Sequence, residues 1–265
     1  MSVTAVLLSG GLDSAVLVAE EAACPGGNVQ PIYVSVGLAW EDAERAMVSR
    51  LLASPLFHAR MRPLVTLAVD MRDVYDATHW AVRGQPPAYH TPDEDVYLAG
   101  RNVILLGKAG VFCAAARIDR LVLGTLGHNP FPDATPAFRS AMADALSLGL
   151  AHPLTIDAPY ADVSKTDVVR RGAELGVPFE LTLSCMNPQS ANRQSAINPQ
   201  STNRQSAINP QSTNRQSTIN PQSAIRNPQW LHCGLCSKCR ERHDAFVDAG
   251  LADPTEYADA RYVDA

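Results

Sequence analysis

Long apolar runs and an excess of basic charge are both missing from this chain. Its 265 residues are 46% hydrophobic, but no stretch approaches the roughly 20 consecutive apolar residues that a membrane-spanning helix requires. The formal net charge of −5 and the pI of about 5.8 argue against a broad nucleic-acid or membrane-surface interface, because such interfaces need a basic face. No charged leader precedes the first apolar run, so we expect a cytoplasmic protein.

Cysteine is scarce, and four of the six cysteines crowd together at Cys185, Cys233, Cys236 and Cys239. A secreted disulfide scaffold would spread them along the chain. Four thiolates can instead form a tetrahedral shell around a structural Zn²⁺ ion. The last three alone could carry a redox or iron–sulfur centre. Lengthening the loop that joins Cys185 to the other three from about 8 to about 47 residues costs only about 1.6 kcal/mol in closure entropy, against roughly 10 kcal/mol or more from zinc binding.

The lysine of a Walker loop is also missing, although a glycine turn follows the first apolar run. The turn lies between an expected strand at 3–8 and an expected helix at 15–23, and it comprises Leu8, Ser9, Gly10, Gly11, Leu12, Asp13 and Ser14. Glycines can take positive φ angles and carry no Cβ, so their N–H groups can close around a pyrophosphate at the helix N-terminus. The serines add hydroxyl donors, and Asp13 is placed to hold the turn or to lie near Mg²⁺. An ordinary glycine turn is the alternative interpretation.

Strand and helix patterns alternate as far as residue 184. We expect further strands at 30–36, 64–69, 121–124 and 154–158, and helices at 41–52, 74–80, 102–116, 138–148 and 165–175. Ser164 should cap the last of these helices. The segment 84–100, with three prolines, is expected to be a long surface loop. This order predicts an α/β fold with a doubly wound parallel sheet, whose ligands lie at the carboxyl ends of the strands.

An 11-residue unit repeats from Asn187 and begins a fourth copy at Asn220. Each unit has one strong hydrophobe and one proline, which favours disorder over a solenoid. We therefore expect a nucleotide-binding domain at 1–184, a zinc-binding region at 185–249 that is interrupted by a disordered insert at 187–228, and a C-terminal tail at 250–265.

Three features together resemble the 7-cyano-7-deazaguanine synthases, PP-loop ATP pyrophosphatases of queuosine and deazapurine biosynthesis. They are the loop at 9–14, the Gly-Arg-Asn at 100–102 that opens an apolar helix, and the Leu-Ser-Cys at 183–185 followed by the cysteine-rich segment 233–240. Lys165 corresponds to a lysine found at this place in the family. The resemblance covers nearly all of the chain apart from the repeats.

The resemblance implies a PP-loop sheet with a small C-terminal zinc-binding appendage and an ATP-dependent ligase activity. Such enzymes adenylate the carboxylate of 7-carboxy-7-deazaguanine, let ammonia displace AMP, then adenylate the amide oxygen and eliminate AMP to leave a nitrile. We expect Asp13, Arg101, Asp133 and Lys165 to be catalytic, the loop 8–14 to bind ATP with Mg²⁺, and the four cysteines to hold zinc. The partners would be small molecules, with no membrane or direct nucleic-acid contact, and a homodimer is the candidate assembly.

The chain departs from the family pattern where substrate would be held. Residues 36–38 read Val-Gly-Leu in place of Tyr-Gly-Gln, residues 131–135 read Phe-Pro-Asp-Ala-Thr in place of Tyr-Pro-Asp-Cys-Arg, and Met186 replaces an aromatic residue. A ligase that amidates a related acid, or that uses another amine, is therefore an alternative. A tRNA-thiolating PP-loop enzyme is a further one, and it would require a basic face and an exposed catalytic cysteine.

Overall fold

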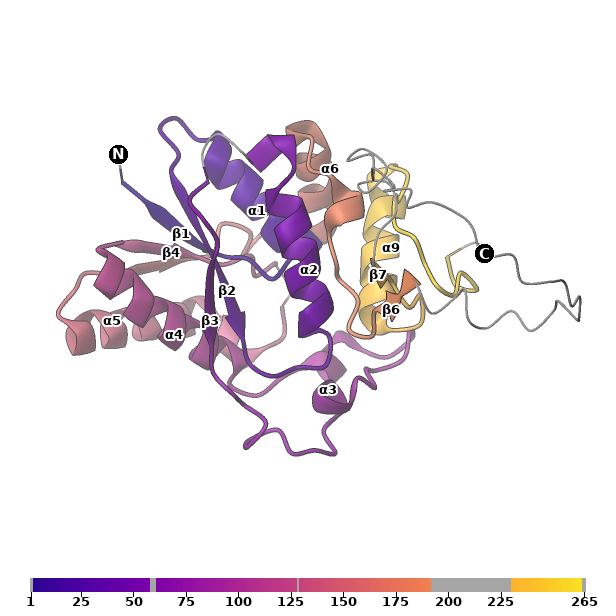
Figure 1. Cartoon of the computed structure of the whole chain (residues 1–265), viewed down its shortest axis with the longest axis horizontal. Helices are drawn as coiled ribbons and strands as arrows, with labels where there is room; N and C mark the ends of the chain where they lie inside the picture. Colours follow the sequence, from indigo (N-terminus) through magenta and orange to yellow (C-terminus); the bar gives the residue numbers. More distant parts are fainter. Residues whose placement is uncertain (1, 58–60, 128, 192–229, 264–265) are drawn as a thin grey trace, which may run out of the picture.

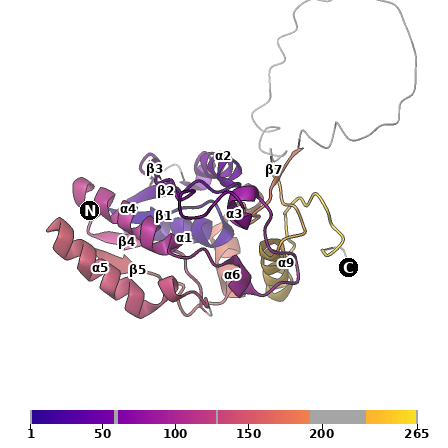
Figure 2. The same cartoon turned by 90° about the horizontal axis from the view of Figure 1, so that it is seen from below.

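The computed structural model describes residues 2–57, 61–127, 129–191 and 230–263. Five parallel strands form one sheet in the order β3-β2-β1-β4-β5 (Figures 1 and 2). These strands are β1 (Thr4–Leu7), β2 (Val29–Ser35), β3 (Val65–Ala68), β4 (Arg120–Val122) and β5 (Thr155–Asp157). The helices are α1 (Leu12–Ala23), α2 (Glu41–Leu52), α3 (Trp80–Arg83), α4 (Arg101–Ala116), α5 (Pro136–Leu150), α6 (Lys165–Leu175) and α9 (Ser237–Ala249). The parallel α/β fold expected from the sequence is confirmed.

The central strand β1 shows why helices cover both faces of the sheet. Its residues are apolar on both sides: Ala5 and Leu7 pack toward α4, whereas Val6 and Leu8 pack toward α1 and α6. Alternate side chains of a strand point to opposite faces, so a continuously apolar strand must be buried twice. Helices α4 and α5 accordingly lie on one face, and α1 and α6 lie on the other (Figure 1).

The strand order places the glycine turn at a topological switch point. The chain leaves β1 in one direction toward β2 and β3, while β4 and β5 extend the sheet in the other. Loops that follow β1 and β4 therefore diverge and leave a crevice at the carboxyl edge of the sheet, where ligands of such folds bind. The expected location of the site follows directly from this order.

The helix expected at 74–80 is wrong. The chain makes turns there, and α3 begins only at Trp80. The Asp76 carboxylate accepts the N–H of Thr78 at 2.7 Å, and the His79 ring accepts the N–H of Ala81 at 3.2 Å. Short side chains that bond to nearby backbone groups compete with helix formation, and they move the helix start to the residue after the cap.

The segment 84–100 is a loop, as expected, but it is not simply a surface loop. Tyr89, Val96 and Leu98 are buried, and a 3₁₀ turn spans Asp93–Val96. The other 3₁₀ turns of the described chain are Pro55–Phe57, Pro132–Ala134 and Phe179–Leu181. The loop passes beside α9, and this contact gives it a part in the site described below.

The C-terminal segments pack onto the sheet domain. Helix α9 lies against α6 (Figure 1), and the four clustered cysteines share an apolar cluster with α4. Residues after 250 fold back, so that the His232 N–H donates to the carbonyl of Glu256 at 3.0 Å. Strand β6 (Gln189–Ser190) pairs antiparallel with β7 (Trp230–Leu231), which places the first residues of the repeats in a small hairpin. The rest of the expected disordered insert, from residue 192, lies outside the described residues.

Among the described helices, none combines the length and the apolar character needed to cross a bilayer.

Candidate active site and metal centre

The glycine turn after β1 joins the strand to α1 through one left-handed residue. Gly10 takes φ +83°, and an added Cβ would lie 2.9 Å from Cγ2 of Val48. Gly11 has φ −68° and caps α1, so a positive φ is needed only at Gly10. The hydroxyls of Ser9 and Ser14 lie 3.2 Å apart, and Ser14 Oγ donates to the Gly11 carbonyl at 3.0 Å. The loop thus presents two hydroxyls at the positive end of the α1 dipole.

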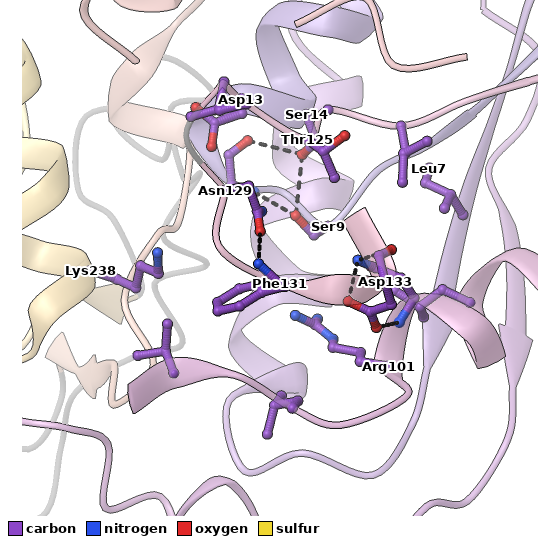
Figure 3. A pocket seen from close by; sticks show the side chains of 18 of the residues that line it. Leu7, Ser9, Asp13, Ser14, Arg101, Thr125, Asn129, Phe131, Asp133 and Lys238 are labelled. Atoms are coloured by element: carbon purple, nitrogen blue, oxygen red, sulfur yellow. Dashed lines mark hydrogen bonds between the residues drawn. The ribbon is translucent and has the colours of Figure 1, made fainter. Parts of the chain in front are cut away.

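A cleft of about 480 Å³ opens in front of this loop at the carboxyl edge of the sheet (Figure 3). All four of the side chains that we expected to be catalytic line it, and so do five of the seven loop residues. The lining set includes Leu8, Ser9, Gly11, Asp13, Ser14, Arg101, Asp133 and Lys165. Gly10 instead turns the chain behind the cleft, and the Leu12 side chain is fully buried in the core.

Asp13 and Lys165 form one end of a row of alternating charges. Lys165 Nζ lies 3.0 Å from Asp13 Oδ2 and 2.7 Å from Glu241 Oε1, and Glu241 Oε2 in turn pairs with Lys238. Burial would lower the pKa of Lys165, but the two carboxylates outweigh it and raise that pKa. Burial would likewise raise the pKa of Glu241, but the two lysines lower it to about 2. Lys165 and Glu241 are therefore held in their charged forms.

Asp133 contacts Asn102 at the start of α4, next to Arg101. Asp133 Oδ2 accepts the Asn102 N–H at 3.0 Å, and the Asn102 side chain donates to the Asp133 carbonyl at 3.1 Å. A carboxylate at a helix N-terminus is stabilised by the helix dipole, so Asp133 fixes the position at which α4 begins. Arg101, the first residue of that helix, lines the cleft, and its buried Nε has no hydrogen-bond partner among the described residues. Its guanidinium is thus available to an anion in the cleft.

A buried carboxyl group on α2 also reaches the cleft wall. Glu44 accepts the Tyr33 hydroxyl at 2.9 Å and the Trp40 Nε1–H at 3.1 Å. Burial raises the pKa of Glu44 to about 7, and the positive charge of Arg101 partly opposes that rise. The neighbouring Glu41 accepts the N–H of Val36 at 2.7 Å and of Gly37 at 3.1 Å. The Glu41 carboxylate therefore fixes the backbone of the segment 36–38, where the chain departs from the family pattern.

Two aromatic rings form an apolar wall of the cleft. Tyr97 and Phe131 stack with ring centroids 5.1 Å apart and an interplanar angle of 29°. Phe131 comes from the segment 131–135, the second place where the sequence departs from the family pattern. Flat apolar faces of this kind suit a planar heterocycle.

The four clustered cysteines form a site that can hold a metal ion. Their Sγ atoms all lie within 4.8 Å of one another, and all four residues are buried. The N–H groups of Cys233 and Asn187 donate to Cys185 Sγ at 3.2 and 3.3 Å. Burial raises the pKa of Cys185 well above the usual thiol value, so the thiolate form needs a nearby cation.

The metal centre and the glycine loop are directly connected. The Leu183 N–H donates to the Gly10 carbonyl at 2.7 Å, two residues before Cys185. On the other side, Cys236 and Cys239 flank Lys238 in the first turn of α9. The two sites therefore share two segments of backbone.

Sequence reasoning missed Glu44, Lys238 and Glu241. Lys238 lies between the last two cysteines of the motif and Glu241 follows it by one helical turn, which is a local signal that they share a helix face. Their pairing with Lys165 depends on the packing of α9 against α6, and no local pattern carries that information. In the sequence, Glu44 resembles an ordinary polar residue of an amphipathic helix, because its burial depends on how the helix packs against the sheet.

Comparison with known proteins identifies the family. Among curated relatives, the 7-cyano-7-deazaguanine synthase of Methanopyrus kandleri is 31% identical over 97% of this chain and 99% of its own length. The synthase of Azoarcus sp. is 27% identical over 95% of both chains.

Similarity to solved structures is much weaker. A U34-tRNA thiolase from Methanococcus maripaludis with a [4Fe-4S] cluster has a TM-score of 0.40 and 15% identity, covering 67% of this chain and 58% of that one. A predicted tRNA methyltransferase subunit from Methanocaldococcus jannaschii has a TM-score of 0.41 and 15% identity, covering 66% and 75%. We draw nothing about function from similarities at this level. The model of the family described as "Queuosine biosynthesis protein QueC" matches residues 3–210, and the chain therefore belongs to this family.

Proposed function

We propose that this protein converts 7-carboxy-7-deazaguanine and ammonia into 7-cyano-7-deazaguanine at the expense of ATP. The observation that carries the proposal is the family membership together with a cleft in which an anion-binding glycine loop faces Arg101 and Lys165. Curated relatives that match nearly the whole chain have this synthase name. The chemistry below is derived for the residues of this chain.

The first half of the reaction activates a carboxylate. The substrate carboxylate attacks the α-phosphorus of ATP, the bond to the β-phosphate oxygen breaks, and pyrophosphate leaves. The N–H groups and hydroxyls of the glycine loop donate hydrogen bonds that stabilise the negative charge building on pyrophosphate, while Arg101 and Lys165 add positive charge. Ammonia then attacks the acyl carbon, AMP leaves with the carboxylate oxygen, and a proton is lost to give the amide.

The second half repeats the activation on the amide. The amide oxygen attacks a second ATP and pyrophosphate leaves again. Loss of AMP and of the remaining N–H protons then forms the nitrile. The stacked rings of Tyr97 and Phe131 offer a surface for the planar heterocycle throughout, and holding both reactants in place supplies much of the rate gain.

Magnesium fits the residues at the glycine loop. Asp13 Oδ2 is paired with Lys165, whereas the buried Oδ1 has no hydrogen-bond partner in the part of the chain that the structure describes. An unpaired carboxylate oxygen is a suitable ligand for a hard cation such as Mg²⁺. A magnesium ion held there would neutralise charge on the leaving phosphates. Both carboxylate oxygens of Asp133 accept hydrogen bonds from Asn102. We therefore infer that Asp133 positions α4 and Arg101.

Zinc fits the four cysteines as a structural ion. A tetrahedron with Zn–S bonds of about 2.3 Å has edges of about 3.8 Å. Cys233 Sγ and Cys239 Sγ lie 3.8 Å apart, and Cys236 Sγ and Cys239 Sγ lie 3.5 Å apart. All four positions of the tetrahedron are filled by thiolates, which leaves no open position for catalysis.

The thiolation alternative is not favoured by the cleft. Its described lining includes no cysteine, and burial raises the pKa of Cys113 to about 12. The alternative that stops at the amide, by contrast, requires the same residues as the nitrile synthesis. Only the products separate these two reactions.

The test supplies the metal-loaded protein with ATP, ammonium and 7-carboxy-7-deazaguanine, and follows pyrophosphate release together with product mass. We expect sustained release only when acid and ammonium are both present, with two pyrophosphates for each nitrile. One pyrophosphate for each amide would instead support the amide-forming alternative. Release that requires a tRNA and a sulfur donor, and not the acid, would overturn the proposal. Asp13→Ala should abolish release and leave the metal content unchanged.

A further inference from the structure

Lysine is rare in this chain, and its placement is uneven. Only three of the 22 lysines and arginines are lysines: Lys108, Lys165 and Lys238. Lys108 is exposed on α4, whereas Lys165 and Lys238 both line the cleft. A flexible ammonium group is a compact point charge that binds phosphate readily.

Lys238 reaches the cleft from the metal-binding segment. It lies in the first turn of α9, between Cys236 and Cys239, and Figure 3 shows its side chain projecting into the cleft. Its ammonium pairs with Glu241, whose other oxygen lies 2.7 Å from Lys165 Nζ. Glu241 thus holds two cations at the same wall of the cleft.

A charge count shows what Lys238 adds. Asp13, Lys165 and Glu241 together carry one net negative charge, and that charge would repel a triphosphate lying on the glycine loop. Lys238 brings the group to neutrality. Like charges that are partly shielded from water repel strongly, so Lys238 lowers the repulsion that a polyanion would meet at the wall formed by Asp13 and Glu241.

We propose that Lys238 is a phosphate-binding residue, and that the cysteine-rich segment thereby supplies one wall of the nucleotide site. This inference rests on the proposed use of ATP and goes beyond it, because it assigns a phosphate contact to the cysteine-rich segment. Glu241 is a positioning residue in this scheme, since it holds Lys165 and Lys238 beside each other. Metal binding at Cys236 and Cys239 fixes the helix turn from which Lys238 extends.

The experiment measures inorganic pyrophosphate binding to the metal-loaded full chain by calorimetry, at several salt concentrations. Lys238→Gln should lower the affinity about tenfold and flatten its salt dependence, because one screened charge interaction is lost. Lys238→Arg should retain most of the affinity. Lys108→Gln is the matched control and should bind like the wild type. Metal content and circular dichroism, measured for every variant, would show that the fold is kept.

Equal affinity of Lys238→Gln and the wild type would overturn the inference, and so would an equal loss in Lys108→Gln. A loss in Lys238→Gln that keeps the wild-type salt dependence would also overturn it, since it would indicate a structural effect. The proposed function is judged separately, by product formation in the wild type. Wild-type turnover with normal pyrophosphate affinity in Lys238→Gln would reject this inference alone. Lys238-dependent pyrophosphate binding without turnover of the acid would reject only the proposed substrate.

Discussion

Gly10→Ala tests whether the glycine turn has the geometry described here. The substitution places a Cβ at a residue with φ +83°, 2.9 Å from Cγ2 of the fully buried Val48. Gly26 provides a matched control, because it has φ +76° and an added Cβ there would meet nothing within 4 Å. The two substitutions share the backbone strain and differ in the steric overlap.

The expected loss in the free energy of unfolding differs between the two variants. A left-handed conformation costs an alanine about 1–2 kcal/mol, and replacing glycine regains about 0.4–1 kcal/mol from the unfolded chain. Gly26→Ala should therefore lower the free energy of unfolding by no more than about 1.5 kcal/mol. Overpacking at Val48 adds about 1–3 kcal/mol for Gly10→Ala. The difference between the variants should thus be about 1–3 kcal/mol.

The assay is urea unfolding of the metal-loaded chain, with the midpoint and the slope both fitted. Val48→Ala removes the methyl group that the new Cβ would strike, so it should cost less in the Gly10→Ala background than in the wild type. Equal destabilisation by Gly10→Ala and Gly26→Ala would refute the reasoning. So would strictly additive effects of the Gly10 and Val48 substitutions.

Three other predictions test the buried carboxyl group, the metal centre and the repeats. The folded state holds Glu44 with a pKa of about 7, against 4.5 for a free glutamate, so it binds a proton that the unfolded state lacks between these values. Stability should therefore fall as the pH rises from about 4.5 to about 7, and Glu44→Gln should remove up to about 3 kcal/mol of this decline in urea unfolding; equal pH profiles would contradict the raised pKa. Cys239→Ser should lose the metal ion and lower Tm, as measured by elemental analysis and calorimetry, whereas Cys24→Ser should leave both unchanged; retained metal would remove Cys239 from the ligand set. Because Ser190 pairs with Trp230, replacing residues 192–229 with Asn-Gly should leave a three-residue loop between the paired strands. Shortening this connection from about 39 residues to about three should stabilise the chain by about 2 kcal/mol and keep its metal content and pyrophosphate release, and a destabilised product would show that the segment contributes to the fold.

Most of the fold could be predicted because its signals are local. The runs at 3–8 and 30–36 are apolar on both faces, as buried parallel strands must be, and the helix bounds 41–52 and 165–175 match the structure. The helix prediction for 74–80 is wrong because two side chains bond to the backbone there. Asp76 and His79 form turns where the apolar spacing alone favours a helix. Periodicity reports which residues are apolar, and it does not report such competition.

The candidate site likewise combines residues that local sequence patterns predict with residues that only the folded structure brings together. The glycine loop and the cysteine spacing are short-range patterns, and the structure places the loop at the cleft and brings the four cysteines together. The charges that complete the cleft come from α2 and α9, and their contribution exists only after these helices pack onto the sheet. Lys165 illustrates the consequence. The sequence indicates a lysine at a helix start, but its charge is set by Asp13 on one side and by Glu241 on the other, 152 and 76 residues away in the chain. A cation neutralised by two carboxylates can bind a polyanion only if other positive charges offset them. Arg101 and Lys238 are in place to do so, and a magnesium ion bound at Asp13 would add to them.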